Sequence, residues 1–332
     1  MDHCNHERTK SPPLYIPALS WSQPCCGGTA SWRKLGAAAA AAAAAAAPGD
    51  GPRALADLGG VPKDLVLYQY EVCPFCCKVK AFLDFQGLPY RTVEVHPISK
   101  SQLKFSTKYK KVPVLMADGV QCNDSNEIIN SLTALLAREG RLRGAPAGGG
   151  GLLGAFAGGR GGRGAAPEPS ETEARMRRWV DERFARVVTV NIYETLGESF
   201  QTFEYITTEC PSWGPVERHG ARVVGAGLMY VIAKRMKTKY NLGESRAELF
   251  ACCDEFDKAL AGRRFLAGDK APGNADLCVF GVLRAVAGTD AFREVMVHGK
   301  MKPWFLAMEA AVGESSRLSQ EAGVPAPAAS GA

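Results

Sequence analysis

The chain has 332 residues, of which 46% are apolar and 22% are charged, and its formal net charge at pH 7 is +6. This balance is typical of a soluble globular protein, and the length allows two domains. Lys and Arg are scattered rather than grouped with aromatic residues, which argues against a nucleic acid partner. Eleven cysteines without a secretory signal indicate an intracellular, reducing environment rather than a disulfide framework.

Residues 1–60 form a low-complexity leader that includes eleven consecutive alanines, Ala37–Ala47. Residues 8–49 contain no Asp or Glu. This composition fits a transit peptide for the mitochondrion or another organelle, and it equally fits a disordered extension, so both interpretations stay open. No apolar stretch reaches the roughly 18 to 20 residues of a membrane span, so we expect no transmembrane helix.

A change in composition near residue 61 marks the predicted start of folding. The segment LVLYQY, residues 65–70, is rich in branched and aromatic side chains and predicts a buried strand. Apolar residues then recur at helical spacing over residues 74–85, and Gly87 is a typical helix stop. The alternating segment YRTVEV, residues 90–95, predicts a second strand, which a connection of about 20 residues through the helix would place parallel to the first.

Two more strands and a helix complete this region at residue 139. The segment KVPVLMADGVQC, residues 111–122, predicts a hairpin around Asp118 and Gly119. Residues 123–139, NDSNEIINSLTALLARE, place their apolar side chains on one helical face. Residues 61–139 therefore predict the order strand, helix, strand, strand, strand, helix.

The rest of the chain divides by composition into three parts. Residues 140–169 are rich in Gly, Ala and Arg and predict a linker or insertion. Six helical patterns with short connections over residues 170–315 predict an all-α domain. Residues 316–332 are expected to form a disordered tail.

The candidate chemistry lies in YEVCPFCCKV, residues 70–79. Cys73 and Cys76 lie three residues apart at the predicted start of a helix, where unpaired N–H groups and the helix dipole stabilise a thiolate. Pro74 suits the first helical position. Cys77 points about 100 degrees around the helix from Cys76, so we expect it to pack in or beside the core.

Three interpretations of this motif compete: a metal site, an inert buried pair and a reactive thiol. Zinc would need a second ligand pair, and neither another C-x-x-C nor a paired histidine follows, so we expect no metal. A strand followed by C-P-F-C and a helix favours the reactive thiol over the inert pair.

The motifs also resemble known families. CPFC resembles the motif of glutaredoxins, KVPVL resembles their cis-proline element, and NDSNEI resembles the corresponding segment of glutathione S-transferases. These segments, together with FEYI, KTKYNL and NADLCVFGVLRA, closely resemble the membrane-associated prostaglandin E synthase type 2 family over residues 61–312.

This resemblance implies an α/β thioredoxin-like, glutaredoxin-type N-terminal domain followed by an all-α glutathione S-transferase-like C-terminal domain, often as a homodimer. It also implies that glutathione binds, and that haem can bind through the glutathione sulfur. Cys73 would be the essential thiol and Tyr70 its hydrogen-bonding partner. Cys76 and Phe75 would line the pocket, Cys76 serving as an optional resolving thiol. Glutathione would be held by Val112, Pro113, Asp124 and Ser125, with a cis peptide bond before Pro113.

The sequence departs from the family at three places. Animal members carry an N-terminal membrane anchor, whereas this chain shows an alanine-rich leader, so membrane association stays open. Gly273 stands where a helix-capping side chain is usual, which leaves Asp276 to cap. The insertion at 140–169 replaces the usual connection between the domains.

Three functions remain. The first is isomerisation of a prostaglandin H2-type lipid endoperoxide to prostaglandin E2 by a Cys73 thiolate. The second is glutathione-linked thiol-disulfide exchange, in which Cys76 resolves a mixed disulfide at Cys73. The third is a non-catalytic module that binds glutathione and haem.

Overall fold

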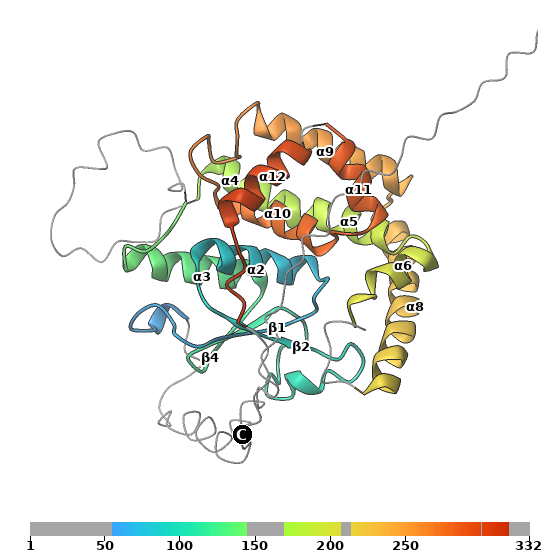
Figure 1. The fold of residues 1–332 in the computed structure, drawn as a ribbon, viewed down its shortest axis with the longest axis horizontal. Coiled ribbons are helices and arrows are strands. Elements are labelled where there is room, and N and C mark those ends of the chain that lie inside the picture. Colours follow the sequence, from blue (N-terminus) through green and yellow to red (C-terminus); the bar gives the residue numbers. More distant parts are fainter. Residues whose placement is uncertain (1–54, 145–168, 207–213, 300, 319–332) are drawn as a thin grey trace, which may run out of the picture.

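The computed structural model describes residues 55–144, 169–206, 214–299 and 301–318 (Figure 1). Most of the predicted leader and linker, and the predicted tail beyond residue 318, lie outside these ranges. No helix within them combines the length and the apolar character needed to cross a membrane.

The N-terminal part is built on a four-stranded mixed sheet with the strand order β2-β1-β3-β4. Strand β1 (Leu65–Gln69) pairs in parallel with β2 (Arg91–Glu94) and antiparallel with β3 (Val114–Ala117). Strand β3 forms a hairpin with β4 (Val120–Asn123). The order of strands and helices predicted for residues 61–139 is therefore confirmed.

Every residue of β1 is buried because both faces of the sheet are covered. Leu65 and Leu67 pack into the cluster that includes the helices, whereas Val66 and Tyr68 alternate to the other face and pack with Leu103. Helices α2 (Pro74–Gln86) and α3 (Ser125–Arg138) lie on the first face (Figure 1). The second face is covered by the irregular segment between β2 and β3, which contains the short 3-10 helix η2 (Ser101–Leu103).

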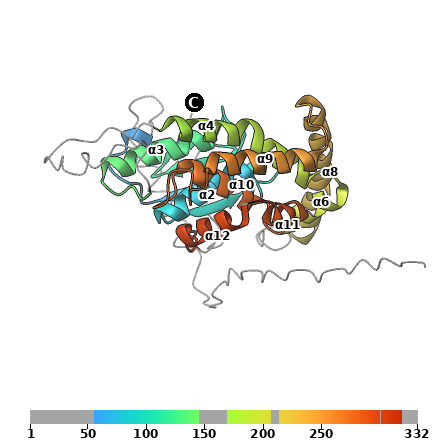
Figure 2. The same cartoon turned by 90° about the horizontal axis from the view of Figure 1, so that it is seen from above.

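The C-terminal part is helical. Its described elements are α4 (Glu171–Trp179), the π-helical segment η4 (Val180–Phe184), α5 (Ala185–Ile192), α6 (Leu196–Thr202), α8 (Pro215–Lys239), α9 (Ser245–Leu260), α10 (Asn274–Ala285), α11 (Asp290–Val297) and α12 (Met301–Val312). Seen from above, α6 and α8 lie at the end of the molecule away from α3 (Figure 2). The predicted all-α domain is confirmed, but α11 is an additional helix that the six sequence patterns did not include.

Three predicted boundaries differ from the structure because long-range contacts order the segments next to them. The leader was predicted to reach residue 60, yet Leu55, in the 3-10 helix η1 (Leu55–Asp57), is buried in the core. The linker was predicted from residue 140, yet Gly144 packs between Phe85 and Pro272. The tail was predicted from residue 316, yet residues 316 and 318 are hydrogen-bonded to the backbone of Tyr90.

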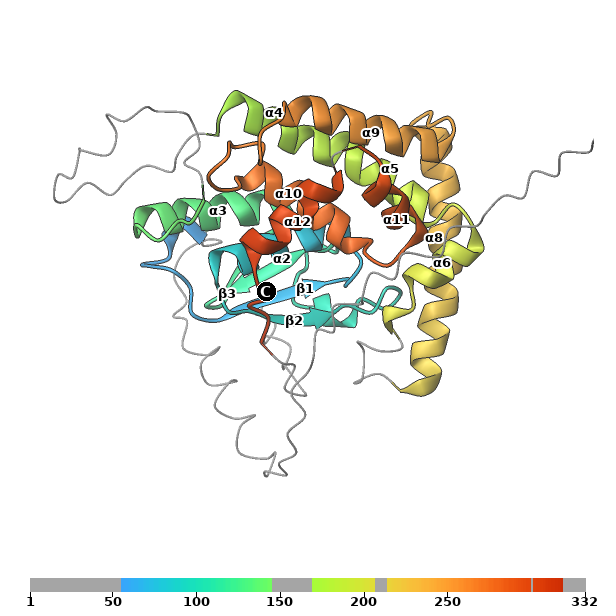
Figure 3. The same ribbon diagram turned by 45° about the horizontal axis from the view of Figure 1, so that its top comes forward.

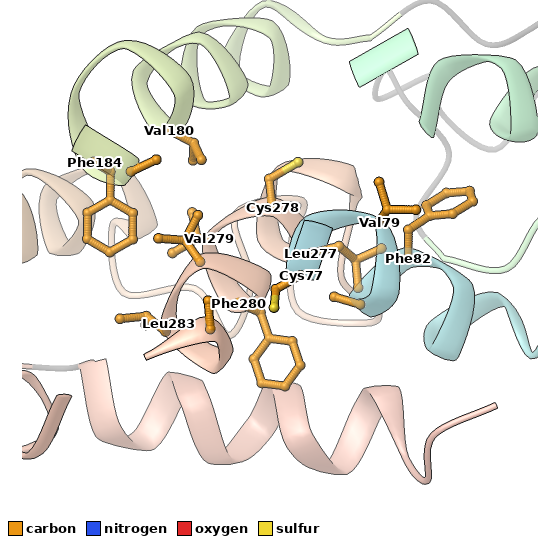
Figure 4. Packing of buried hydrophobic residues seen from close by; sticks show 14 of the residues in the cluster. Cys77, Val79, Phe82, Val180, Phe184, Leu277, Cys278, Val279, Phe280 and Leu283 are labelled. Atoms are coloured by element: carbon orange, nitrogen blue, oxygen red, sulfur yellow. The ribbon is translucent and has the colours of Figure 1, made fainter. Parts of the chain in front are cut away.

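The two parts meet where α2 packs against α10 (Figures 3 and 4). Gly281 of α10 lies so close to α2 that a Cβ there would stand 2.6 Å from the Cys77 carbonyl oxygen and from the Lys78 nitrogen. Around this contact, Cys77 and Val79 of α2 pack with Leu277 and Phe280 of α10 (Figure 4). The helix that follows the C-P-F-C motif is thus embedded between the sheet and the helical domain.

We expect Gly281→Ala to destabilise the protein by about 1–3 kcal/mol, because the added methyl group forces the two helix backbones apart. Gly227, inside α8 with nothing within 4 Å of its would-be Cβ, is the matched control. Gly227→Ala should instead leave the stability unchanged or raise it by about 0.5–1 kcal/mol, because alanine is the better helix former. Urea unfolding measures both, and equal effects of the two changes would contradict the close contact.

Candidate active site

Cys73 is the N-cap residue of α2, and Pro74 follows at the start of the helix. The Cys73 backbone N–H donates to the Tyr70 carbonyl over 3.0 Å, and the Cys73 carbonyl accepts the Cys77 N–H over 2.9 Å. A tight turn after β1 therefore presents the half-buried Cys73 thiol at the open end of α2, as the motif predicts.

The surroundings of Cys73 and Cys76 shift the pKa values of the two thiols in opposite directions. A hydrogen bond from the Cys76 thiol lowers the pKa of Cys73 and, against the effect of burial, the backbone N–H groups of Cys76 and Phe75 and the charge of Lys80 lower it further. Burial raises the pKa of Cys76 well above its ordinary value, and so does its hydrogen bond to Cys73. Cys73 therefore ionises more readily than Cys76, and the Cys76 thiol is the one that donates to it.

The third cysteine of the motif is part of the core. Cys77 is 2% exposed, and its thiol donates to the Glu71 carbonyl over 3.2 Å. Burial raises the pKa of Cys77 to about 11, which disfavours its thiolate. The packing role predicted for this residue agrees with its position.

Tyr70 lies at the start of the turn and packs against the cluster on the second face of the sheet. Its pKa is raised to about 12, first by burial and then by the negative charge of Cys73. Its hydroxyl therefore stays protonated at neutral pH. It also lies close enough to Cys73 for a negative charge there to affect its pKa. Donation from this hydroxyl to Cys73 remains a prediction, since the contact recorded between the two residues is the backbone hydrogen bond.

The residues predicted to hold glutathione lie just before β3 and at the start of the neighbouring helix α3. The peptide bond between Val112 and Pro113 is cis, as expected. Asp124 caps α3, its carboxylate accepting the Asn126 N–H over 2.8 Å, and Ser125 is buried in the first turn. Asp124 has φ 70°, a region that residues other than glycine rarely adopt and that occurs often at functional sites. Glutathione binding by these residues remains a prediction.

Two tyrosines that the motifs do not contain complete the surroundings of Cys73. Burial raises the pKa of Tyr109, and so do the charges of Asp124, Cys76 and Cys73, so its hydroxyl lies near both the thiols and the α3 cap. Burial and the charge of Cys73 raise the pKa of Tyr193, which follows α5 in the helical domain. Neither residue belongs to a local pattern, because the tertiary fold brings them to the thiol.

A polar cluster joins this site to the helical domain. The Lys78 ammonium, which is fully buried, contacts the Asp181 carboxylate at 2.5 Å and the Asn126 side-chain oxygen at 3.0 Å. The Asn126 amide nitrogen contacts the other Asp181 oxygen at 2.5 Å. Asp181 lies in η4, a π-helical segment, and such segments are frequent at functional sites. The cluster thus connects α2, the start of α3 and the helical domain.

Within the described part of the chain, no three His, Cys, Asp or Glu side chains come together as a metal site would require. The site chemistry visible in the structure is that of thiols, hydroxyls and backbone N–H groups. It can stabilise a thiolate.

The glutathione S-transferase N-terminal domain family matches residues 67–139. Prostaglandin E synthase 2 of Mus musculus is 36% identical over 281 residues, which cover 76% of this chain and 71% of the mouse protein. Prostaglandin E synthase 2 of Danio rerio is 35% identical, with coverage of 74% and 71%.

This chain belongs to the prostaglandin E synthase 2 family. The resemblance inferred from the motifs is therefore confirmed, as is the thioredoxin-like and glutathione S-transferase-like fold class. The crystal structure of the beta-etherase LigF from Sphingobium is also similar, with a TM-score of 0.48 and 18% identity over 75% of this chain and 96% of that one.

Removal of the Cys76 donor tests the electrostatic asymmetry of the two thiols. Alkylation by iodoacetamide follows the thiolate, so the pH at which the Cys73 rate reaches half its plateau reports its pKa. We expect this pH to lie below the ordinary thiol value of about 8.5 and to rise in Cys76→Ala, because the variant loses the hydrogen bond that stabilises the anion. The modified peptide is identified by mass spectrometry, and an unchanged profile would contradict the donor role of Cys76.

The Lys78 cluster yields a stability prediction. Asp181→Ala should destabilise the protein by about 3 kcal/mol, because it leaves the Lys78 ammonium buried without its carboxylate. The double variant Lys78→Met/Asp181→Leu should recover part of the loss, since no unpaired charge remains. Arg293→Ala is the control. It removes an exposed ion pair with Asp290 and should change the free energy of unfolding by less than about 1 kcal/mol.

Proposed function

We propose that this protein isomerises a prostaglandin H2-type endoperoxide to prostaglandin E2 through the thiolate of Cys73, with glutathione bound beside it. Family membership and the glutathione S-transferase-type domain indicate a glutathione-related function. The observation that carries the finer proposal is the half-buried Cys73 thiol, which accepts hydrogen bonds from Cys76 and from the helix start.

The reaction needs one nucleophile and consumes no electrons. The Cys73 thiolate attacks one peroxide oxygen, forming a sulfur–oxygen bond as the oxygen–oxygen bond breaks. The other oxygen leaves as an alkoxide and takes up a proton. A base then removes the proton from the carbon that bears the sulfur-bound oxygen; the carbonyl forms, the sulfur–oxygen bond breaks, and the thiolate is regenerated.

The hydroxyls around Cys73 suit the proton transfers of this scheme. Tyr70 and Tyr193 both respond to the charge of Cys73, and burial raises both pKa values, so they remain donors at neutral pH. They can therefore stabilise the alkoxide without adding a positive charge. Glutathione, held by the Val112 backbone and the start of α3 at Asp124 and Ser125, would supply a second thiol in the same pocket.

A second candidate is the thiol-disulfide exchange, which the direct hydrogen bond between Cys73 and Cys76 favours. In that reaction Cys73 forms a mixed disulfide and Cys76 displaces glutathione from it. Glutaredoxin 1 of Rickettsia prowazekii is 28% identical over 82 residues. Haem binding, homodimer formation, organelle targeting and membrane association remain predictions from the sequence.

Substitution of each thiol separates the two reactions. We expect Cys73→Ser to abolish the formation of prostaglandin E2 from the endoperoxide, whereas Cys76→Ser keeps much of it because the serine hydroxyl can still donate to the thiolate. Product analysis is run with and without glutathione and with and without haem. Equal loss in both variants would rule out the one-thiol scheme.

The same variants are assayed with a small glutathione mixed disulfide. Reduction of this substrate by the parent protein, lost in Cys76→Ser, would favour the exchange reaction through a resolving thiol. Turnover of the endoperoxide in the absence of such reduction would leave isomerisation as the function.

A further inference from the structure

Two carboxylates lie together where the paired strands β1 and β2 end, next to the turn that contains Cys73. Glu94 ends β2, and Glu71 lies between β1 and Cys73. The Gln69 amide nitrogen donates to both, over 2.6 Å to Glu71 and 3.3 Å to Glu94. The Glu71 N–H donates to the Glu94 carboxylate over 3.1 Å. These hydrogen bonds tie the turn before Cys73 to both carboxylates.

Two cations bind the Glu71 carboxylate, one from the nearby helix α2 and one from a distant part of the chain. The Lys80 ammonium of α2 contacts Glu71 Oε1 at 2.6 Å and also donates to the Glu71 carbonyl over 3.2 Å. The Arg317 guanidinium contacts Glu71 Oε2 at 3.1 Å. Burial raises the pKa of Glu71, but the charges of Lys80 and Arg317 outweigh it and hold the pKa at about 2.

Glu94 carries little charge at neutral pH. Burial and the charge of Glu71 raise the pKa of Glu94 to about 8, although it accepts hydrogen bonds from the Glu71 N–H and the Tyr205 hydroxyl. The negative charge of the pair thus lies mainly on Glu71, two residues before Cys73 in the chain. A negative charge near a thiol disfavours its thiolate unless a cation offsets that charge.

Arg317 is brought to this place by the last described segment, residues 315–318. The Leu318 N–H donates to the Tyr90 carbonyl over 2.8 Å, just before β2. The Ser315 hydroxyl and the Ser316 N–H each donate to the buried Asp84 carboxylate of α2 over 2.9 Å. Asp84 also pairs with Arg284 of α10 at 2.7 Å. The segment is thus held at several points, and Arg317 is directed to Glu71.

We propose that Arg317 is a positioning residue for the reactive thiol, acting through Glu71 to hold the turn between β1 and α2 and to keep its carboxylate from opposing a thiolate at Cys73. This inference rests on the role of Cys73 in the proposed function. Without Arg317, Lys80 would be the one cation left on Glu71 within the described part of the chain. Its charge, which also favours the Cys73 thiolate, would then be more fully offset by the carboxylate.

The test measures the iodoacetamide alkylation rate of Cys73 against pH in the full chain. In Arg317→Gln we expect the half-plateau pH to rise by about half a unit to one unit, which lowers the rate well below that pH about 3- to 10-fold. Arg317→Lys keeps the charge and should remain close to the parent. Arg293→Gln, which removes an exposed arginine on α11, should have no effect.

Glu71 provides the decisive comparison, because Arg317 is proposed to act through it. In the Glu71→Gln background, Arg317→Gln should no longer raise the half-plateau pH, since no carboxylate charge remains to be neutralised. A rise of the same size with and without Glu71 would overturn the inference. So would an unchanged profile in Arg317→Gln.

The assay needs no endoperoxide, so its outcome is distinguishable from that of the proposed function. If the parent protein fails to isomerise the endoperoxide but Arg317→Gln shifts the alkylation profile as expected, the proposed reaction is wrong and the positioning role stands. If isomerisation proceeds and the alkylation profile of Arg317→Gln is unchanged, the proposed reaction stands and the positioning role is wrong. Thermal unfolding of each variant shows whether a changed alkylation rate reflects an unfolded fraction. The double variant Glu71→Gln/Arg317→Gln repeats the comparison without an unpaired Glu71 carboxylate.

Discussion

The close approach of α2 and α10 at Gly281 is the contact on which the candidate site depends. It leaves no space for a side chain on α10 and fixes the thiol helix against the helical domain. Because the interior of a protein is close-packed, a helix held in this way cannot rotate or slide freely. The direction of the open N-terminal end of α2, and with it the electrostatic environment of Cys73, is consequently set by the packing of two parts of the chain that are far apart in sequence.

The buried charges of α2 also depend on how this helix is docked. Lys78, Lys80 and Asp84 all belong to α2, and each is paired with a residue outside that helix. Burial of an ion is unfavourable unless a partner of opposite charge is supplied in good geometry. These pairs therefore make α2 poorly compatible with any alternative docking, since a shifted helix would leave several charges without partners. They contribute to specificity of the arrangement as much as to its stability.

The sequence predicted the parts of this structure that depend on local patterns. The strands around the C-P-F-C motif and the thiol at the helix start follow from side-chain periodicity and helix-end chemistry, which act over a few residues. The Asp276 cap was predicted in the same way, and its carboxylate accepts the Gly273 N–H over 3.0 Å.

Residues whose roles depend on the tertiary fold were not predicted. Tyr109 and Tyr193 lie near enough to Cys73 for its charge to raise their pKa values, and Asp181 contacts Lys78 although the two residues are 103 positions apart. Arg317 lies in a segment whose small and polar residues suggested a disordered tail. Its order comes from Asp84, Tyr90 and Glu71, which no local pattern connects with it.

The pairing of residues 316 and 318 with Tyr90 also bears on how the molecule avoids unwanted association. Strand β2 lies at an edge of the sheet, and an edge strand offers unpaired backbone groups to which a strand of another molecule can add. Here the chain itself occupies the backbone groups of Tyr90 at the start of that edge. The segment that delivers Arg317 thereby shortens the surface on which a foreign strand, or a misfolded copy of the same protein, could nucleate aggregation.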